Sequence, residues 1–110
     1  MANVLKNLGQ SAPAATTATT LYTVPALTSA VVSSITVCNR SATATAFRVA
    51  IRPAGAALAD QMYLYYDVPI AGNDTFIATV GISLATTDVI TVYNTLATLS
   101  FQAYGQEQTA

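Results

Sequence analysis

Few residues in this chain of 110 residues could do chemistry, and the missing types exclude most of it. There is no histidine, so the commonest general base and the commonest zinc ligand are both absent. Cys38 is the only cysteine, which excludes an intrachain disulfide and a cysteine-based metal site. Serines are frequent, but none has a base beside it, and no glycine-rich phosphate loop occurs. We expect no enzyme, no metal and no other cofactor.

Aspartates are the remaining candidate metal ligands. Four of them fall at expected strand ends or turns: Asp60, Asp67, Asp74 and Asp88. Turn carboxylates are hard oxygen ligands, so one interpretation is a calcium site. No Asp-x-Asp or EF-hand spacing concentrates them, and the other interpretation is hydrogen bonding to nearby backbone N–H groups. We favour the second interpretation.

Arginines form the only cationic pair on an expected strand. Arg48 and Arg52 lie on one face of the segment 45–52, and Arg40 lies in the turn before it. Guanidinium groups at this spacing could bind a phosphate or a carboxylate surface. Equally, they could pair with aspartates of a neighbouring strand or subunit. Both alternatives make Arg48 and Arg52 candidate interface residues.

Tyrosines form the densest aromatic cluster. Strict alternation predicts Tyr63 and Tyr65 on one face and Leu64 and Tyr66 on the other, so both faces are partly apolar. Tyrosine is enriched at protein interfaces, and we interpret Tyr63 and Tyr65 as interface residues. A sugar-binding platform is the alternative. For Cys38 we expect a small buried or half-buried hydrophobic residue.

The composition excludes two further classes. Four Lys/Arg against five Asp/Glu give a net charge of −1, which lacks the clustered cations of a nucleic-acid-binding surface. Hydrophobic residues make up 53%, yet no apolar run reaches the ~18 residues of a membrane span. Charged residues make up only 8%, against about 25% in an ordinary soluble domain. We therefore expect neither a nucleic acid nor a membrane as partner.

Residues 20–107 have the pattern of a single all-β domain. Short segments rich in Val, Ile, Thr and Tyr alternate with turn clusters, as in antiparallel sandwiches. The expected strands cover residues 21–24, 30–38, 45–52, 62–67, 75–80, 88–93 and 98–104. The segment 45–52 is the clearest, with Phe47, Val49 and Ile51 on one face. This predicts a seven- to eight-stranded antiparallel β-sandwich, immunoglobulin-like or jelly-roll-like.

The segments that flank this domain show no lasting period. Within residues 1–19, Val4, Leu5 and Leu8 could make one helical turn, but Gly9 and Pro13 end it. No signal-peptide core develops after Lys6. We expect an extended N-terminal arm over residues 1–19, able to add a strand to a neighbour's sheet, and a C-terminal tail over 108–110. Val4, Leu5 and Leu8 are its candidate interface residues.

Scarcity of charge also predicts assembly. Sandwiches commonly protect their edge strands with lysine, and Lys6 is the only lysine here. The simplest resolution is that edges and apolar patches are covered in a permanent assembly. We expect a homo-oligomer, a trimer or a dimer, with a structural role.

Several runs resemble small virion structural proteins of tailed bacteriophages. They are residues 21–26 (LYTVPA), 34–40 (SITVCNR), 81–84 (GISL), 88–93 (DVITVY) and 101–105 (FQAYG). The resemblance covers about residues 20–107 and rests on a pattern of strands and turns. It implies a sandwich that oligomerises on a virion, binds the major capsid protein or other virion proteins, and carries no catalytic residues.

Two locations on a virion remain open from this resemblance. The absence of a fibre repeat or heptad favours a capsid decoration (cement) protein on the capsid surface, acting through its arm and sandwich edges. A tail or fibre-associated structural or receptor-binding module is the alternative. A cellular adhesin or pilin-like subunit is less favoured, because no secretion signal is recognised.

Overall fold

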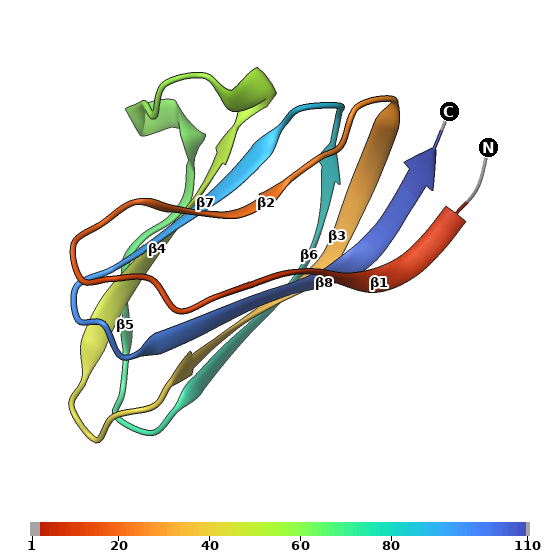
Figure 1. Ribbon diagram of the computed structural model, residues 1–110. Helices are drawn as coiled ribbons and strands as arrows, with labels where there is room; N and C mark the ends of the chain where they lie inside the picture. Colours follow the sequence, from red (N-terminus) through yellow and green to blue (C-terminus); the bar gives the residue numbers. More distant parts are fainter. Residues whose placement is uncertain (1–2, 110) are drawn as a thin grey trace.

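The computed structural model describes residues 3–109 as a chain of β-strands (Figure 1). The strands are β1 (Asn3–Ser11), β2 (Thr19–Thr23), β3 (Thr28–Asn39), β4 (Thr45–Arg52), β5 (Tyr63–Ile70), β6 (Thr75–Leu84), β7 (Val89–Asn94) and β8 (Leu99–Thr109). Two 3-10 turns, η1 (Pro53–Gly55) and η2 (Asp60–Met62), lie between β4 and β5. No α-helix occurs in the described part of the chain.

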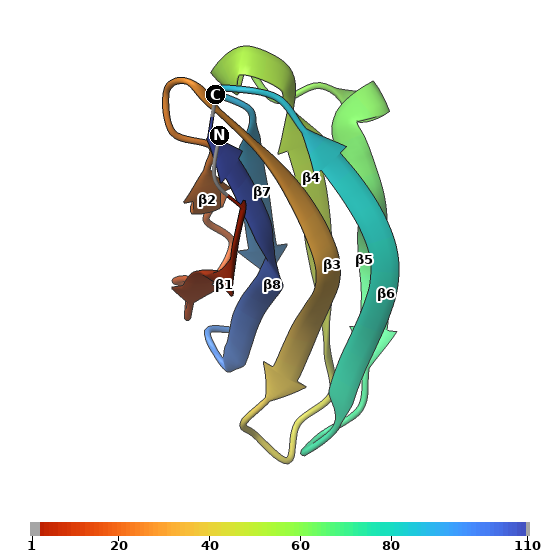
Figure 2. The ribbon, with the colours of Figure 1, turned by 90° about the vertical axis from the view of Figure 1, so that its right-hand side faces the viewer.

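The strands form two antiparallel sheets that lie face to face (Figure 2). The first sheet has the order β1-β8-β3-β6, and the second has the order β2-β7-β4-β5. Except for β4 and β5, strands that follow one another in sequence belong to different sheets. The chain therefore crosses repeatedly between the layers, and the termini of the described segment lie side by side in the first sheet.

The core lies between the two sheets and is built by alternation. Alternate residues of β3, β4 and β8 turn inward, including Ile35, Phe47 and Phe101, which are buried completely or nearly so. In β3 a register shift between Val32 and Ser34 interrupts this alternation once. The rings of Phe47 in the second sheet and Phe101 in the first are 6.1 Å apart and edge to face, a favoured aromatic arrangement. All seven strands expected from the sequence are present, and the expected 45–52 matches β4 at both ends.

The extended N-terminal arm is not confirmed, because most of that segment belongs to the first sheet. β1 pairs with β8 from Asn3 to Ser11, and Leu8 is buried in the core instead of forming a helical turn. A register shift between Asn7 and Gly9 interrupts the alternation, which explains why the sequence shows no period. Gly9 is required there, since an added Cβ would come within 2.1 Å of the Leu21 carbonyl oxygen.

Two smaller expectations are also corrected. Cys38 is exposed, because β3 turns it away from the core while Val37 points inward. Residues 108 and 109, expected in a tail, continue β8 and pair with Ser29 and Thr28 of β3. The last strand ends later than the sequence predicts, because Gly105 and the polar residues after it lack the apolar alternation by which strands are recognised.

Truncation of a core ring tests this register. We expect Phe101→Ala to reduce the free energy of unfolding by about 3–5 kcal/mol, because it leaves a cavity between the sheets. Ser100→Ala, on the same strand but turned outward, should change it by no more than about 0.5 kcal/mol. Urea unfolding of both variants measures the difference, and equal losses would contradict the inward placement of Phe101.

Candidate interaction surfaces

The outer side of the first sheet is a continuous surface without charge. Strand register places the same rows of residues on this side across all four strands. We call it the uncharged face, and its residues include Leu5, Asn7, Gln10, Ser100, Gln102, Tyr104, Gln106, Val31, Thr36, Cys38, Thr75, Ile77 and Thr79. None of these side chains is charged. The face offers hydroxyls, amides and apolar groups only.

Aliphatic side chains are unusually open on this face. Leu5 is 80% exposed, Ile77 66% and Val31 47%. Leu5 and Val31 lie on either side of Gln106 and line a shallow groove of about 440 Å³ together with Tyr104 and Lys6. An aliphatic group open to water is unfavourable by about 25 cal/mol per Å², so covering this groove would be favourable.

A cluster of hydrogen-bonded amide side chains lies on the uncharged face. The Gln102 Oε1 atom accepts hydrogen bonds from Asn7 Nδ2 at 3.1 Å, Gln10 Nε2 at 3.0 Å and the Tyr104 hydroxyl at 2.9 Å. One acceptor thus fixes three side chains from β1 and β8. Because these groups are already ordered, a partner docking here would lose less side-chain entropy than on a mobile surface.

Glu107 joins the two sheets at one end of the molecule. Its carboxylate accepts hydrogen bonds from the Tyr22 hydroxyl of β2 at 2.5 Å and from Lys6 Nζ of β1 at 3.1 Å. The bond to Tyr22, helped by Lys6, holds the pKa of Glu107 below its ordinary 4.5, although burial opposes that shift. Burial, followed by the contact with Glu107, raises the pKa of the Tyr22 hydroxyl. The Lys6 ammonium group is thereby directed toward Glu107, while Lys6 also lines the groove beside Leu5.

Arg48 is the centre of a second surface, on the outer side of the second sheet. Its guanidinium carbon lies 4.1 Å from the centroid of the Tyr66 ring and 4.4 Å from that of Tyr93, so two cation–π contacts hold it. Arg48 Nε donates to Asp67 at 2.6 Å and Nη2 donates to the same carboxylate at 3.3 Å. The bond to Asp67 is the main cause of a raised pKa at Arg48. We call Arg48, Tyr63, Tyr66 and Tyr93 the arginine–tyrosine cluster.

A hollow of about 240 Å³ adjoins this cluster. Arg48, Tyr63 and Tyr93 line one part of it, and Thr91 and Leu58 line another. Tyr63 packs edge to face against Tyr66, with ring centroids 4.9 Å apart. The hollow therefore combines ring surfaces, hydroxyls and a guanidinium group, and such groups can bind a polar ligand. None of them is a nucleophile with a base next to it.

Tyr63 and Tyr65 do not share a face, contrary to the alternation expected for this segment. Tyr65 points into the core, where its ring lies 5.4 Å from Phe76, whereas Tyr63 is on the outer side with Tyr66. The cause is two register shifts between β4 and β5, each with an extra residue in β5. Asp67 has a φ of 51°, a conformation that accompanies such irregular pairing. Each extra residue reverses the side to which the following side chains point.

The other arginines serve loops. Arg52 donates to the carbonyl oxygens of Ala56 at 2.7 Å and Gly55 at 2.9 Å, which closes the chain around η1. Arg40 Nη2 donates to the Ala97 carbonyl oxygen at 3.3 Å. Pairing with an aspartate of a neighbouring strand, one of the alternatives expected from the sequence, occurs at Arg48. Arg52 and Arg40 bind backbone carbonyl oxygens, which was not expected.

Two aspartates follow the turn chemistry expected from the sequence. Asp88 accepts hydrogen bonds from the backbone N–H groups of Ala54 and Ala85, each at 2.9 Å, and ties two loops together. Asp74 accepts one from the Thr75 N–H at 2.8 Å. Among residues 3–109, no group of three or more Cys, Asp and Glu is placed to hold a metal ion.

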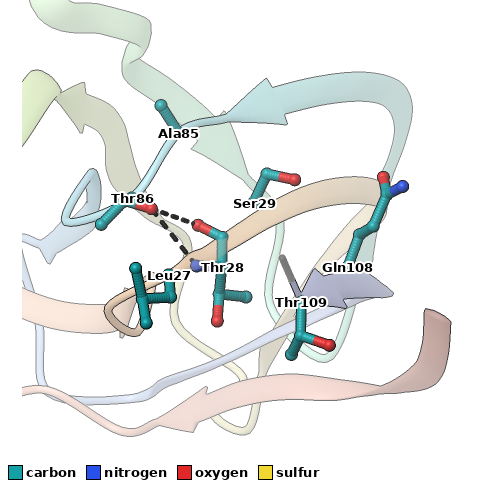
Figure 3. A pocket seen from close by; sticks show the side chains of 7 residues that line it. All are labelled: Leu27, Thr28, Ser29, Ala85, Thr86, Gln108 and Thr109. Carbon is teal, nitrogen blue, oxygen red and sulfur yellow. Dashed lines mark hydrogen bonds between the residues drawn. The ribbon is translucent and has the colours of Figure 1, made fainter. Parts of the chain in front are cut away.

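Another hollow lies at the end of the sheets, beside the loops after β2 and β6 (Figure 3). It measures about 500 Å³. The Thr86 hydroxyl donates to the Thr28 carbonyl oxygen at 2.7 Å and accepts from the Thr28 N–H at 3.3 Å, so the two loops are joined beneath it. The side chains that line it are aliphatic, hydroxyl or amide groups, without an acid or a base.

The candidate interface residues from the sequence fall on separate parts of the molecule. Val4, Leu5 and Leu8 are in β1 of the first sheet, with Leu5 outward and Leu8 buried; Arg48, Arg52, Tyr63 and Tyr65 are in the second sheet. Sequence reasoning missed Gln102 and Tyr93. The pairing of Gln102 with Gln10, and of Tyr93 with Arg48, depends on register between distant segments, which no local pattern reveals.

Comparisons of the chain with protein-family models, curated proteins and solved structures found no match in any of the three. Within residues 3–109 no helix has the length and hydropathy needed to cross a membrane. The assignment of a function therefore depends on the surfaces described above.

The contact between Tyr22 and Glu107 predicts a pH-dependent stability. The depressed pKa of Glu107 means that this carboxylate stabilises the fold above about pH 4.5, and that the contribution disappears as pH falls through its folded-state pKa. Tyr22→Phe should therefore reduce the free energy of unfolding by about 1–2 kcal/mol near neutral pH and by progressively less in acid. Urea unfolding at a series of pH values measures this.

Tyr104→Phe is the matched control, because its hydroxyl donates to the neutral amide of Gln102. The loss of unfolding free energy in Tyr104→Phe should stay constant over the same pH range. A Tyr22→Phe deficit that is also constant would contradict the role assigned to the Glu107 carboxylate.

Proposed function

We propose that the protein is a non-enzymatic virion structural protein, a capsid decoration (cement) protein that oligomerises and stabilises a phage head. The observation that carries this proposal is the uncharged face, which crosses all four strands of the first sheet. A surface of hydroxyls, amides and open aliphatic groups suits a lasting contact better than free exposure to solvent.

Shape and charge distribution support this assignment. The chain measures 45 × 27 × 20 Å, so a broad face can lie on a shell while adding little thickness. Lys6, Arg48 and Arg52 all bond within the chain. An attachment through the uncharged face would consequently depend on apolar burial and hydrogen bonds, with little sensitivity to salt.

We also propose that the sandwich-like fold is a jelly roll. In immunoglobulin-like sandwiches the first strand pairs with the second, whereas here β1 pairs with β8 and β2 with β7. Two sheets of four strands each are typical of jelly rolls, which occur in viral capsid proteins as well as in lectins and other families. The fold is compatible with a virion protein, but the fold alone decides no function.

Residues Asn3–Ser11 of the expected N-terminal arm do not act as an arm in this proposal, because they form β1, which is bonded to β8 of the same chain. What replaces it is Leu5 of β1, which contributes its exposed side chain to the uncharged face. Attachment then uses side chains of a sheet face, and oligomerisation uses backbone groups of a sheet edge.

Binding to capsids tests the proposal. Val31→Lys places a charge in the middle of the uncharged face, where docking would strip its water without offering a partner. We expect its affinity for capsids assembled without the protein to fall by at least about tenfold, as measured by co-sedimentation. Thr20→Lys, on an exposed position of the second sheet, is the control and should bind as the wild type does. Equal binding by both variants would refute attachment through this face.

A tail or fibre-associated receptor-binding module is the second candidate, favoured by the hollow beside the arginine–tyrosine cluster. Aromatic rings with hydroxyl and guanidinium groups around a hollow of about 240 Å³ could bind a sugar. For a capsid decoration protein we expect no signal on a glycan array. A glycan signal that is lost in Tyr63→Ala and kept in Tyr104→Phe would favour the receptor-binding module instead.

A further inference from the structure

We propose that the protein self-associates through β6, with two copies pairing their β6 strands antiparallel about a two-fold axis, so that their first sheets become continuous. This specifies the oligomer within the proposed function, but the observations that carry it concern β6 alone.

Three of the four sheet edges carry features that discourage strand pairing. The edges are β1 and β6 in the first sheet and β2 and β5 in the second (Figure 2). β5 has Pro69, which offers no N–H group, and the two register shifts that distort it. β1 has Lys6 and a register shift after Asn7, and β2 is only five residues long. Charges, prolines, irregular pairing and short length are the usual protections of edge strands.

β6 lacks these protections over its first six residues, Thr75–Val80. This stretch has no charge, no proline and no glycine, and it pairs with β3 in unbroken register from Thr75 to Thr79. Ile77 is 66% exposed in the middle of it. The irregularity in β6 comes later, at Gly81, whose φ is +60°. An edge that is regular, apolar and rich in β-branched residues is a ready template for another strand.

The backbone direction leaves hydrogen-bonding groups free at the centre of this edge. The Asn39 N–H donates to the Asp74 carbonyl oxygen at 2.9 Å, which turns the backbone groups of Asp74 toward β3. In an antiparallel ladder the backbone N–H and C=O groups of successive residues point to alternate sides. The backbone groups of Phe76 and Ala78 therefore also face β3, and the backbone groups of Thr75, Ile77 and Thr79 face outward. The Thr75 N–H bonds to the Asp74 carboxylate, so the Ile77 and Thr79 groups and the Thr75 carbonyl are the ones available.

A two-fold axis at Ile77 uses these groups in register. Ile77 then lies opposite its own copy, and Thr75 lies opposite Thr79 of the second molecule. About four backbone hydrogen bonds form, and the side-chain pairs are isoleucine with isoleucine and threonine with threonine, both favourable across strands. The most exposed side chain of the edge is buried at the axis.

A second copy is the occupant that fits this edge best. Close to a two-fold axis each residue meets itself or a near neighbour, so a charged residue there would face a like charge. Thr75–Leu84 contains no charge and is therefore free of this repulsion. The β1 edge of a neighbour fits this place less well, because it carries Lys6 and a register shift after Asn7.

Sedimentation of the full-length protein tests the association. We expect the wild type to form a dimer that Ile77→Lys weakens by at least about tenfold in dissociation constant, because two ammonium groups would meet at the axis. Leu5→Lys is the matched control: it adds the same charge to the opposite edge strand of the same face and should leave the dimer intact. A wild type that remains monomeric, or equal weakening by both variants, overturns the proposal.

Disulfide formation tests the register. In a Cys38→Ser background, Ile77→Cys should cross-link on oxidation, because opposed Cα atoms in a hydrogen-bonded antiparallel pair are about 5.5 Å apart, within disulfide range. Thr79→Cys in the same background should not, since its two copies would be about 14 Å apart. Cross-linking of Thr79→Cys in preference to Ile77→Cys would overturn the two-fold axis at Ile77.

The two proposals fail separately. Weakening of the dimer by Ile77→Lys and not by Leu5→Lys supports pairing through β6, whether or not the wild type binds capsids. A wild type that dimerises through β6 and binds no capsid would remove the capsid function and leave the β6 pairing in place.

Discussion

The packing of two inward-facing sheet surfaces is the interaction on which the rest of this structure depends. With only 8% charged residues, the chain relies on burial of apolar side chains and on paired backbone groups for its stability. Phe47 and Phe101 meet across the layers, and Ile35 and Val92 are buried beside them. Because alternation fills the core from one side of each strand, the other side is free to take almost any composition.

The charged residues are used to hold the molecule together locally, and they cover little of its broad surfaces. Glu107 joins the sheets through Tyr22, and Arg48 is held between two tyrosine rings beside Asp67. Arg52 and Asp88 close loops through backbone groups. What remains on the outer side of the first sheet is a neutral layer of amides and hydroxyls with open aliphatic groups. That division between bonded charges and a neutral face supports contact with a partner over a wide area.

Irregular pairing decides where the functional surfaces lie. The two extra residues in β5 send Tyr65 into the core and bring Tyr63 and Tyr66 together on the outside. The register shift in β1 allows Leu8 to reach the core, and Gly9 permits the close approach of β2. Where such irregularities are absent, as at the start of β6, the strand keeps a regular register along its edge, which suits pairing with another strand.

Alternation of apolar and polar residues was enough to determine the all-β class, the positions of seven strands and the inward direction of Phe47 and Val49, because these depend on neighbours along the chain. The hydrogen bonds of Asp74 and Asp88 to nearby backbone N–H groups could be predicted for the same reason. The tertiary structure alone decided that β1 joins β8, that Cys38 is exposed and that Tyr63 and Tyr65 separate. A register shift reverses every later side chain, and a strand without periodicity is recognised only by the partner that bonds to it.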